Sequence, residues 1–297
     1  MSSLLCIGDV MLDVVAVIKD KINYGSDTPS SISTHGGGAA GNVASWARVS
    51  GAPTHIVARV GDDSAGIAVL SEFDSLGITH NRAIVPGKPT GVVVVLVDKS
   101  GERTMFPESG ANSGLTIGDL PELSTFSAVY LSGYALLDEI SRPGVLEMIT
   151  KINQQQIPIF LDPATVGGMS QVDIHEVRSW LPLMSGLFMN EEEASFLTEE
   201  RDVDVALDAL LKSAPLVVIK RGARGAIGKI RGNKSVSVSA VPTSVVDTTG
   251  AGDSFAGGYI ARWMTDGNLE DCLHAGAISA GQCVAIVGAR PHVTPAL

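Results

Sequence analysis

The run Asp247-Thr248-Thr249-Gly250-Ala251-Gly252-Asp253-Ser254-Phe255 carries the residue types best suited to chemistry. It follows a β-rich run, Ser235–Val246, and opens an amphipathic helical pattern. The small Gly-Ala-Gly segment lets an anion approach the backbone, and the first N–H groups of a helix have no partner within it. Asp253 follows directly and is able to accept a proton from a hydroxyl. The run therefore predicts an anion hole beside a carboxylate base.

The position of Asp253 also bears on its acidity. A helix N-terminus favours the charged form of an acid, so this position predicts a low pKa for Asp253. Such a base suits phosphoryl transfer, in which the hydroxyl proton leaves late. An isolated Gly-x-Gly-Asp would be better explained as a plain turn with a first-turn acid, and the complete run favours a functional site.

Polar residues elsewhere gather at one predicted edge. A second glycine cluster, Gly37-Gly38-Ala39-Ala40-Gly41-Asn42, opens another helical pattern. Polar residues follow several predicted strands, namely Asp9, Ser132-Gly133, Asp162-Pro163, Asn190 and Lys220-Arg221-Gly222. Ligands of open α/β sheets bind at the carboxyl ends of the strands, where helix N-termini point. Any one of these residues is better explained as a helix cap, and their agreement along one edge indicates a ligand site.

Apolar β-rich runs alternate with longer helical patterns. Strands are predicted at Leu4–Ile7, His55–Val60, Ala128–Leu131, Ile157–Leu161, Leu187–Met189 and Leu216–Ile219. Helices are predicted at Asn42–Val49, Ser64–Leu76, Val145–Gln155, Glu191–Leu197, Val205–Lys212, Ser254–Thr265 and Leu269–Val287. This alternation predicts an α/β fold with a doubly wound, mostly parallel sheet flanked by helices. We expect residues 1–297 to form a single domain, since no linker or repeat is visible.

Two stretches depart from the alternation. Weak strands are predicted at Val14–Ile18 and Ser31–His35, and a hairpin at Gly91–Asp98 and Glu102–Pro107. We expect these insertions, at about residues 14–36 and 88–108, to pair into a small β-sheet lid. Because Val92–Val97 is apolar on both faces, a partner surface is a natural cover, which favours a homodimer through the lid. A second layer of the lid within the same chain would also explain the pattern.

With these motifs in order, the sequence resembles the ribokinase-like (PfkB) family of carbohydrate kinases over essentially its whole length. Asp247–Asp253 resembles the C-terminal signature of that family, and Gly37–Ala44 the N-terminal one. The resemblance implies a ribokinase-like fold and an ATP-dependent phosphotransferase that moves the γ-phosphate of ATP to a hydroxyl of a small sugar. It implies Asp253 as the catalytic base and Gly250, Ala251 and Gly252 as the anion hole.

The same resemblance implies the remaining site residues. The acceptor is expected to contact Asp13, Gly37, Gly38, Asn42 and Asn112. ATP is expected to contact Asn190, Lys220, Gly222, Gly225, Gly250 and Gly252. Glu193 is implied to organise Mg²⁺ through water, and Asp247 to hold a monovalent cation such as K⁺, as in some members. The residues alone also permit structural roles. Asn190 and Glu193 form a capping-box pattern, Asp13 suits the end of a hairpin, Asn112 could cap a turn, and Asp247 could be structural.

The acceptor stays open between a neutral sugar, the first choice, and a nucleoside. The predicted lid shows no clustered Arg/Lys pair that would call for a phosphorylated sugar. A non-catalytic sugar-binding protein is a further alternative, which the intact Asp253 argues against.

A dinucleotide-binding oxidoreductase is the main rival. Gly36–Gly41 satisfies G-x-G-x-x-G, with Asp62 and Asp63 about 20 residues further on. Ser30–His35 before it offers one apolar residue where the fingerprint needs a buried strand. A P-loop kinase is excluded more firmly. In its nearest match, Gly222–Ile230, Ala223 stands where the motif requires its first glycine, and Ile230 stands where the Mg²⁺-binding Ser/Thr belongs.

Composition excludes several classes. The chain is 45% apolar with a net charge of −11 and no basic run, so we expect no nucleic-acid partner. Its three cysteines are far apart, which is typical of free thiols in a reducing cytoplasm. The N-terminus lacks the basic start of a signal peptide, and Val92–Val97 is too short to span a bilayer, so we expect no membrane partner.

Overall fold

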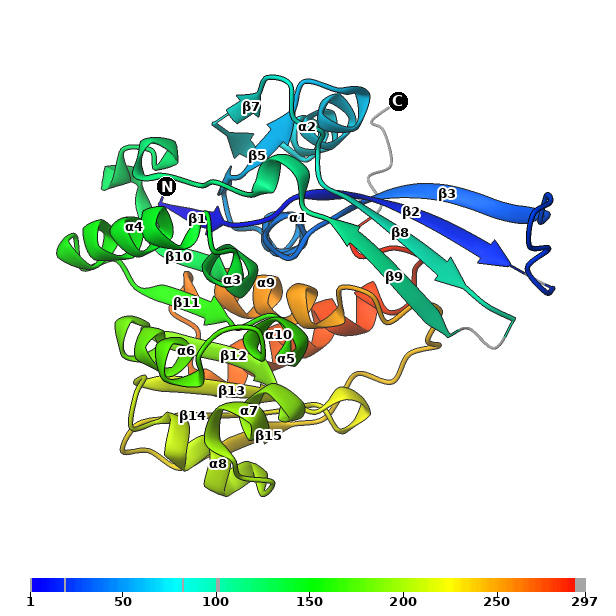
Figure 1. Ribbon diagram of the computed structural model, residues 1–297. Helices are drawn as coiled ribbons and strands as arrows, with labels where there is room; N and C mark the ends of the chain where they lie inside the picture. The colour runs from blue at the N-terminus through cyan, green and yellow to red at the C-terminus, as the bar shows by residue number, and fades with distance from the viewer. Residues whose placement is uncertain (1, 19, 82, 100–101, 292–297) are drawn as a thin grey trace.

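The computed structural model describes residues 2–18, 20–81, 83–99 and 102–291. Within these ranges, nine strands form a sheet in the order β15-β14-β13-β12-β11-β10-β1-β4-β6 (Figure 1). They are β1 (Ser3–Ile7), β4 (Thr54–Val57), β6 (Thr79–His80), β10 (Phe126–Ser132), β11 (Ile159–Asp162), β12 (Gly186–Asn190), β13 (Leu216–Lys220), β14 (Ala226–Ile230) and β15 (Val236–Val238). Pairing is parallel from β6 to β13 and antiparallel across β14 and β15. The predicted mostly parallel sheet is confirmed.

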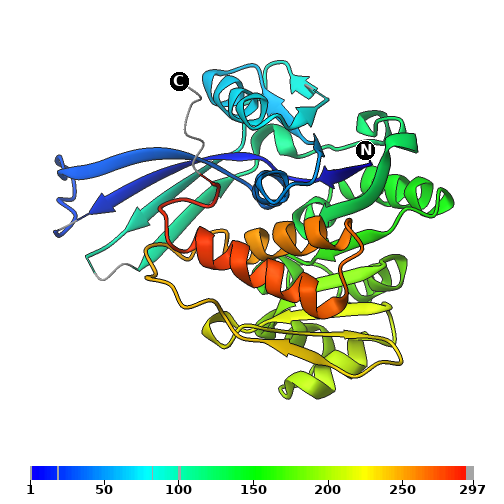
Figure 2. The ribbon, with the colours of Figure 1, turned by 180° about the vertical axis from the view of Figure 1, so that it is seen from behind.

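Helices cover both faces of this sheet (Figures 1 and 2). One face carries α1 (Ala39–Val49), α2 (Ser64–Leu76), α9 (Ala251–Trp263) and α10 (Leu269–Cys283). The other carries α3 (Gly133–Leu137), α4 (Arg142–Gln154), α5 (Val166–Met169), α6 (Ile174–Trp180), α7 (Glu191–Thr198) and α8 (Val203–Leu210). Short 3₁₀-helices are η1 (Gly110–Asn112), η2 (Ile117–Asp119), η3 (Leu123–Thr125), η4 (Leu181–Leu183) and η5 (Gly222–Arg224).

The two faces explain why the central strands are apolar throughout. Leu5 and Ile7 of β1 pack into the core under α4–α8, whereas Leu4 and Cys6 pack under α1, α9 and α10. Alternate residues of a strand point to opposite faces, so a strand covered on both sides needs apolar side chains at every position. Across the described ranges, every helix is too short or too polar to cross a bilayer.

A second sheet projects beyond the main one, in the order β3-β2-β8-β9 (Figure 1). Its strands are β2 (Met11–Ile18), β3 (Ser30–Gly37), β8 (Val92–Val97) and β9 (Arg103–Glu108). The predicted accessory sheet is therefore confirmed. In β8 Val95 is buried and Val94 is 38% exposed, so the chain itself covers part of this strand. The predicted homodimer through the lid stays a prediction.

One predicted strand is corrected, and one β-rich run is a strand only in part. His55–Val60 was expected as one strand, but β4 ends at Val57, and β5 (Arg59–Gly61) pairs with β7 (Ala83–Val85) in a separate small sheet. In Ser235–Val246 only β15 is a strand. Pro242 has no N–H for a ladder, and Val241 and Val245 line a cleft instead of packing in a core.

Candidate active site

A cleft of about 1160 Å³ opens between the carboxyl ends of the parallel strands and the accessory sheet. Residues just after β1 and at the ends of β11, β12 and β13 form one wall, and β2, β8 and β9 form another. All of the predicted site residues line it except Gly37 and Asp247. The fold thus brings to one place side chains that are far apart in the sequence.

The first turn of α9 forms the floor of the cleft. Gly250 precedes the helix with φ of 74°, in the left-handed region that suits glycine, and no side chain caps the helix. A Cβ on Gly250 would lie 2.7 Å from the Cβ of Ala289, so the close packing of this turn also requires glycine. In the first turn the Ala251 N–H donates to the Thr248 carbonyl at 3.3 Å, and the N–H groups of Gly252 and Asp253 are left for an anion.

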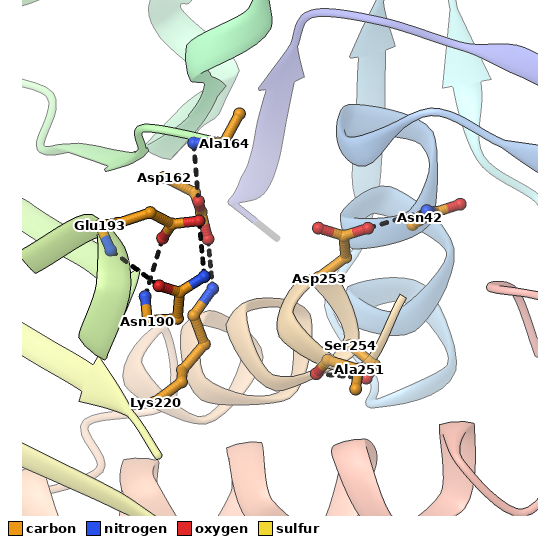
Figure 3. Close-up of polar contacts among 9 residues, drawn as sticks. All are labelled: Asn42, Asp162, Ala164, Asn190, Glu193, Lys220, Ala251, Asp253 and Ser254. Carbon is orange, nitrogen blue, oxygen red and sulfur yellow. Dashed lines mark hydrogen bonds and ion pairs between the residues drawn. The ribbon is translucent and has the colours of Figure 1, made fainter. Parts of the chain in front are cut away.

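The Asp253 carboxylate lies beside this turn, and its Oδ2 accepts a hydrogen bond of 2.8 Å from Nδ2 of Asn42 on α1 (Figure 3). The expectation of a low pKa for Asp253 is wrong. Burial raises its pKa to about 7, against the lowering effect of the Asn42 hydrogen bond, and the Asp162 charge raises it further. Desolvation outweighs the helix N-terminus here, so the group is poised to gain or lose a proton near neutrality.

A second polar group faces the other side of the same turn (Figure 3). Lys220, the last residue of β13, pairs with the Asp162 carboxylate at the end of β11. A Cβ on Gly252 would lie 2.9 Å from the Lys220 Nζ, so the ammonium faces the glycine turn. Burial disfavours the charged lysine, yet Asp162 and Glu193 together hold the pKa of Lys220 above its usual value. The ammonium is therefore a fixed positive charge next to the anion hole.

Asn190 and Glu193 form a complete capping box at the start of α7. The Asn190 side chain accepts from the Glu193 N–H and the Glu193 carboxylate accepts from the Asn190 N–H, both at 2.8 Å. The structural role predicted for this pair is thus present. Burial raises the pKa of Glu193 to about 7, and the Asp162 charge adds to that rise. Because both residues line the cleft, the capping role is compatible with a role toward a ligand.

On the opposite wall, Asp13 of β2 is 8% exposed, and its Oδ1 is buried without a hydrogen-bond partner. Burial raises its pKa to about 6, against the lowering effect of the Arg290 charge. A Cβ on Gly37 would lie 2.1 Å from the Asp13 Oδ1, so Gly37 makes room for this carboxylate. Because Asp13 lines the cleft, its carboxylate is suited to accept a hydrogen bond from a ligand hydroxyl.

Other predicted acceptor-side residues have clear structural tasks. Asn112 donates to the carbonyls of Val10 and Ser109 and accepts from the Val10 N–H, so both of its donors are used. Gly38 has φ of 85°, and a Cβ there would lie 2.6 Å from the Asp9 carbonyl oxygen. Replacing Gly38 would therefore disturb the backbone before it disturbed a ligand.

The two glycines near η5 differ. Gly225 has φ of 83°, and a Cβ on it would lie 2.0 Å from the Val238 carbonyl oxygen, so this glycine is required by packing. Gly222 has φ of 57°, and a Cβ on it would meet no atom within 4 Å, so its backbone faces open space at the cleft.

Asp247 lies behind the glycine turn and outside the cleft lining. Its Oδ1 accepts from the Thr249 N–H at 2.8 Å and from Arg103 at 2.6 Å, and its Oδ2 accepts from the Gly288 N–H at 3.0 Å. Burial opposes the charge, but these hydrogen bonds and Arg103 hold the pKa of Asp247 below its usual value. Arg103 belongs to β9 of the accessory sheet, so this ion pair ties that sheet to the turn.

The oxygen donors near the turn fit Mg²⁺. This ion binds through one or two carboxylates, substrate phosphates and its own water molecules, without needing an all-protein cage. Glu193 and Asp162 supply carboxylates within the cleft. No cluster of three or more His, Cys, Asp or Glu side chains suited to a metal exists in the part of the chain that the structure describes. Any Mg²⁺ here would therefore rely on water and on a ligand for most of its coordination.

Sequence reasoning named Asp9 and Asp162 only as polar strand ends, and it missed Arg290. Asp9 caps α1 from outside the helix, since its Oδ2 accepts from the Ala39 N–H at 2.8 Å. Asp162 is the partner of Lys220. Arg290 is 3% exposed and contacts Asn42. Its neighbours Gly288-Ala289 and Pro291 indicate only a turn, and no local sequence pattern predicts that this arginine is buried.

Comparisons with known proteins find similar sequences and similar folds. The profile of the family described as pfkB family carbohydrate kinase matches residues 1–296. A ribokinase from Arabidopsis thaliana is 30% identical over 255 residues, which cover 81% of this chain and 65% of that protein.

Solved structures share the fold over nearly the whole chain. Arabidopsis thaliana ribokinase complexed with ribose and ATP has a TM-score of 0.81 at 25% identity, covering 97% of this chain and 94% of that one. A ribokinase II candidate from E. coli in complex with ATP and Mg²⁺ has a TM-score of 0.87 at 22% identity, with 97% and 94% covered. At this low identity, the second likeness is one of fold alone.

Proposed function

This chain belongs to the pfkB family of carbohydrate kinases, and we propose that it moves the γ-phosphoryl group of Mg²⁺·ATP to a hydroxyl of a small neutral sugar. The observation that carries the proposal is the half-buried Asp253 carboxylate at the uncapped start of α9, in one cleft with the Asp13 carboxylate. A relative named ribokinase, and a solved ribokinase structure containing ribose and ATP, support these substrates.

Each side of the cleft has a distinct task in this reaction. Asp253 orients the acceptor hydroxyl and receives its proton as the new O–P bond forms. The backbone N–H groups after Gly250 and the Lys220 ammonium stabilise charge on the transferring group. Asp13 accepts a hydrogen bond from a second hydroxyl and so fixes which oxygen meets Asp253.

Glu193 would hold the Mg²⁺ that accompanies ATP, directly or through water. Asp162 lines the same cleft. When bound, Mg²⁺ would offset the negative charge of the phosphate groups of ATP. The Asn190–Glu193 capping box fixes the position of this carboxylate before any ligand arrives.

A neutral acceptor fits the charges of the cleft. Among the described residues that line it, Lys220 is the sole Lys or Arg, and it is already paired with Asp162. Arg103 is held by Asp247 and Arg290 by Glu72. A phosphorylated sugar would need a free cation near Asp13. The cation there, Arg290, is paired with Glu72, and the other charges that act on Asp13 are negative.

A nucleoside is the second candidate. Met11, Val93, Met105 and Pro107 line the accessory-sheet side of the cleft and offer an apolar surface to a base. The ribose of a nucleoside presents the same hydroxyl chemistry to Asp13 and Asp253 as a free sugar does. Rates of ADP release with a panel of acceptors therefore separate a nucleoside from a free sugar.

We expect ADP release with Mg²⁺·ATP to be fastest with a neutral pentose or hexose, slower with nucleosides and slowest with sugar phosphates. The measurement is a coupled assay of ADP across this panel, with and without excess EDTA. EDTA should abolish turnover, because Mg²⁺ offsets the phosphate charge. A sugar phosphate as the best acceptor would contradict the neutral-sugar proposal, and acceptor-independent ADP release throughout would contradict the kinase proposal.

Arg103 bears on the predicted monovalent cation at Asp247. Both carboxylate oxygens already have donors, so this donor set does not fit a cation while Arg103 is in place. We expect kcat to be nearly equal in KCl and in tetramethylammonium chloride at matched ionic strength. Arg103→Gln should lower kcat and make it depend on K⁺. A strong K⁺ requirement of the unmodified enzyme would show instead that the ion displaces Arg103.

A further inference from the structure

Arg290 is the most deeply buried guanidinium in contact with this site, at 3% exposed. It donates from Nη1 to the Glu72 Oε2 at 2.8 Å, from Nη2 to the Gly37 carbonyl at 2.5 Å and from Nε to the Asn42 Oδ1 at 3.3 Å. Its Cζ also lies 4.6 Å from the centre of the Phe73 ring. Burying an arginine costs free energy unless its donors are well satisfied, and here each edge of the guanidinium has an acceptor.

Motif glycines make room for this side chain. A Cβ on Gly41 would lie 2.3 Å from the Arg290 Nη2, and one on Gly36 would lie 2.4 Å from its Nη1. Two glycines of the apparent G-x-G-x-x-G therefore serve to admit Arg290. This explains the pattern without a dinucleotide, and it ties the N-terminal signature to a residue near the other end of the chain.

The loop that presents Arg290 is held on both sides. The Trp46 Nε1 of α1 donates to the Ala289 carbonyl at 2.9 Å. The Gly288 N–H donates to Asp247, which also binds the turn before α9. Arg290 is thus anchored to the same two elements, α1 and the start of α9, that carry Asn42 and Asp253.

The contact with Asn42 decides how that amide is oriented. An asparagine amide has an acceptor oxygen and a donor nitrogen, and its neighbours select which way it faces. An arginine is a donor only, so it holds the Asn42 Oδ1 toward itself and leaves Nδ2 to donate to the Asp253 Oδ2 at 2.8 Å. A flipped amide would aim an oxygen at a carboxylate.

We propose that Arg290, braced by Glu72, is a positioning residue that orients the Asn42 amide so that it donates to Asp253. The inference rests on the proposed role of Asp253 as the base. Arg290 is not among the residues that line the cleft, and it reaches the cleft through its hydrogen bond to Asn42, which does line it.

Several charged or titratable groups also face Asp253 and are left unchanged by a substitution at Arg290. They are Asp9, Tyr130, Tyr134, Asp162, Glu193, Lys220 and Cys283. Arg290 itself faces Glu72, Asp13 and Asp9, and its charge lowers the pKa of Asp13. The direct electrostatic effect of the Arg290 charge on the pKa of Asp13 must therefore be separated from its effect on Asp253 through Asn42.

Arg290→Met should move the acid limb of the pH profile of kcat/KM to higher pH by about one unit, because Asp253 loses a hydrogen bond to its charged form. Near pH 7 the loss should be about five- to tenfold, and most of it should be recovered near pH 9. Arg290→Lys, which keeps a donor and the charge, should restore part of the profile. A folded Arg290→Met enzyme with an unshifted profile would overturn the proposal.

A double-variant cycle tests whether the effect passes through Asn42. Asn42→Ala alone should shift the limb in the same direction, and adding Arg290→Met should shift it no further. An additional shift of the same size in the double variant would show a direct field effect and overturn the positioning role. Trp46→Phe is the matched structural control, because it loosens the same loop without removing the guanidinium, and it should lower thermal stability without moving the profile.

A readout independent of activity separates this inference from the proposed function. In protein carrying ¹³C-labelled aspartate, the Asp253 Cγ signal is identified by its absence from Asp253→Asn. Its titration midpoint should rise in Arg290→Met and in Glu72→Gln, and should return toward normal in Arg290→Lys. Absence of kinase turnover with a shifted midpoint would contradict the proposed function alone, and an unshifted midpoint would contradict the role of Arg290.

Discussion

Replacing Asp253 by Asn is expected to lower kcat by about 10²–10⁴-fold, the range in which a general base contributes, while ATP binds almost normally. The amide keeps the shape of the carboxylate but takes up no proton. Asn42 still has the Oδ1 of the new side chain to donate to. The measurements are steady-state kcat with the best acceptor and a separate ATP-binding titration. Near-normal kcat would refute the assignment of Asp253 as base.

The pH dependence gives this variant a second signature. Because the pKa of Asp253 is raised to about 7, unmodified kcat/KM should rise with pH through neutrality as the base loses its proton. Asp253→Asn should lack that limb. Glu193, with a pKa also raised to about 7, supplies the control, since Glu193→Gln should keep the limb that belongs to Asp253.

Protonation of Asp253 also makes the free energy of unfolding depend on pH. The folded pKa of Asp253 lies above that of an unfolded aspartate, so the folded state binds the extra proton between about pH 4 and 7. Its contribution to stability is complete below this window and is lost as pH rises through it. At about pH 8, Asp253→Asn should therefore be at least as stable as the unmodified chain. Strong thermal destabilisation would point to misfolding rather than to lost chemistry.

Replacing Lys220 by Met is expected to reduce the free energy of unfolding by about 3–5 kcal/mol, the usual consequence of leaving one partner of a buried ion pair alone. The side chains of Lys220 and Asp162 are only 15% and 7% exposed, so water screens the pair weakly. The Lys220 charge also lowers the pKa of Asp253. The acid limb of kcat/KM should therefore move to higher pH in the same variant, and KM for ATP should rise.

The Lys220→Met/Asp162→Asn double variant is the control for this prediction. Removing both charges should restore most of the lost stability, because no buried carboxylate remains unpaired. ATP turnover should stay low, since the positive charge at the anion hole is still missing. Urea unfolding and ADP release give the two readouts. Full stability in Lys220→Met alone would mean that water or a counter-ion already satisfies Asp162.

Sequence reasoning reached most of the elements because their signals are local. Asn190 and Glu193 are three residues apart, so a capping box is readable from the sequence and is present. The accessory sheet was readable from two insertions that break the strand–helix alternation. The prediction of one strand at His55–Val60 was wrong because a buried apolar run has the same pattern whether it stays in one sheet or continues into another.

The sequence by itself determined the glycine turn, the carboxylate that follows it, the polar ends of the strands and the mostly parallel sheet. Only the tertiary structure decided how acidic Asp253 is, because desolvation depends on everything packed around it. It also decided that Arg103 reaches Asp247 and that Arg290 reaches Asn42. Such pairs join residues more than a hundred positions apart, and no local periodicity or spacing encodes them, since a long side chain finds its partner only once the core has closed.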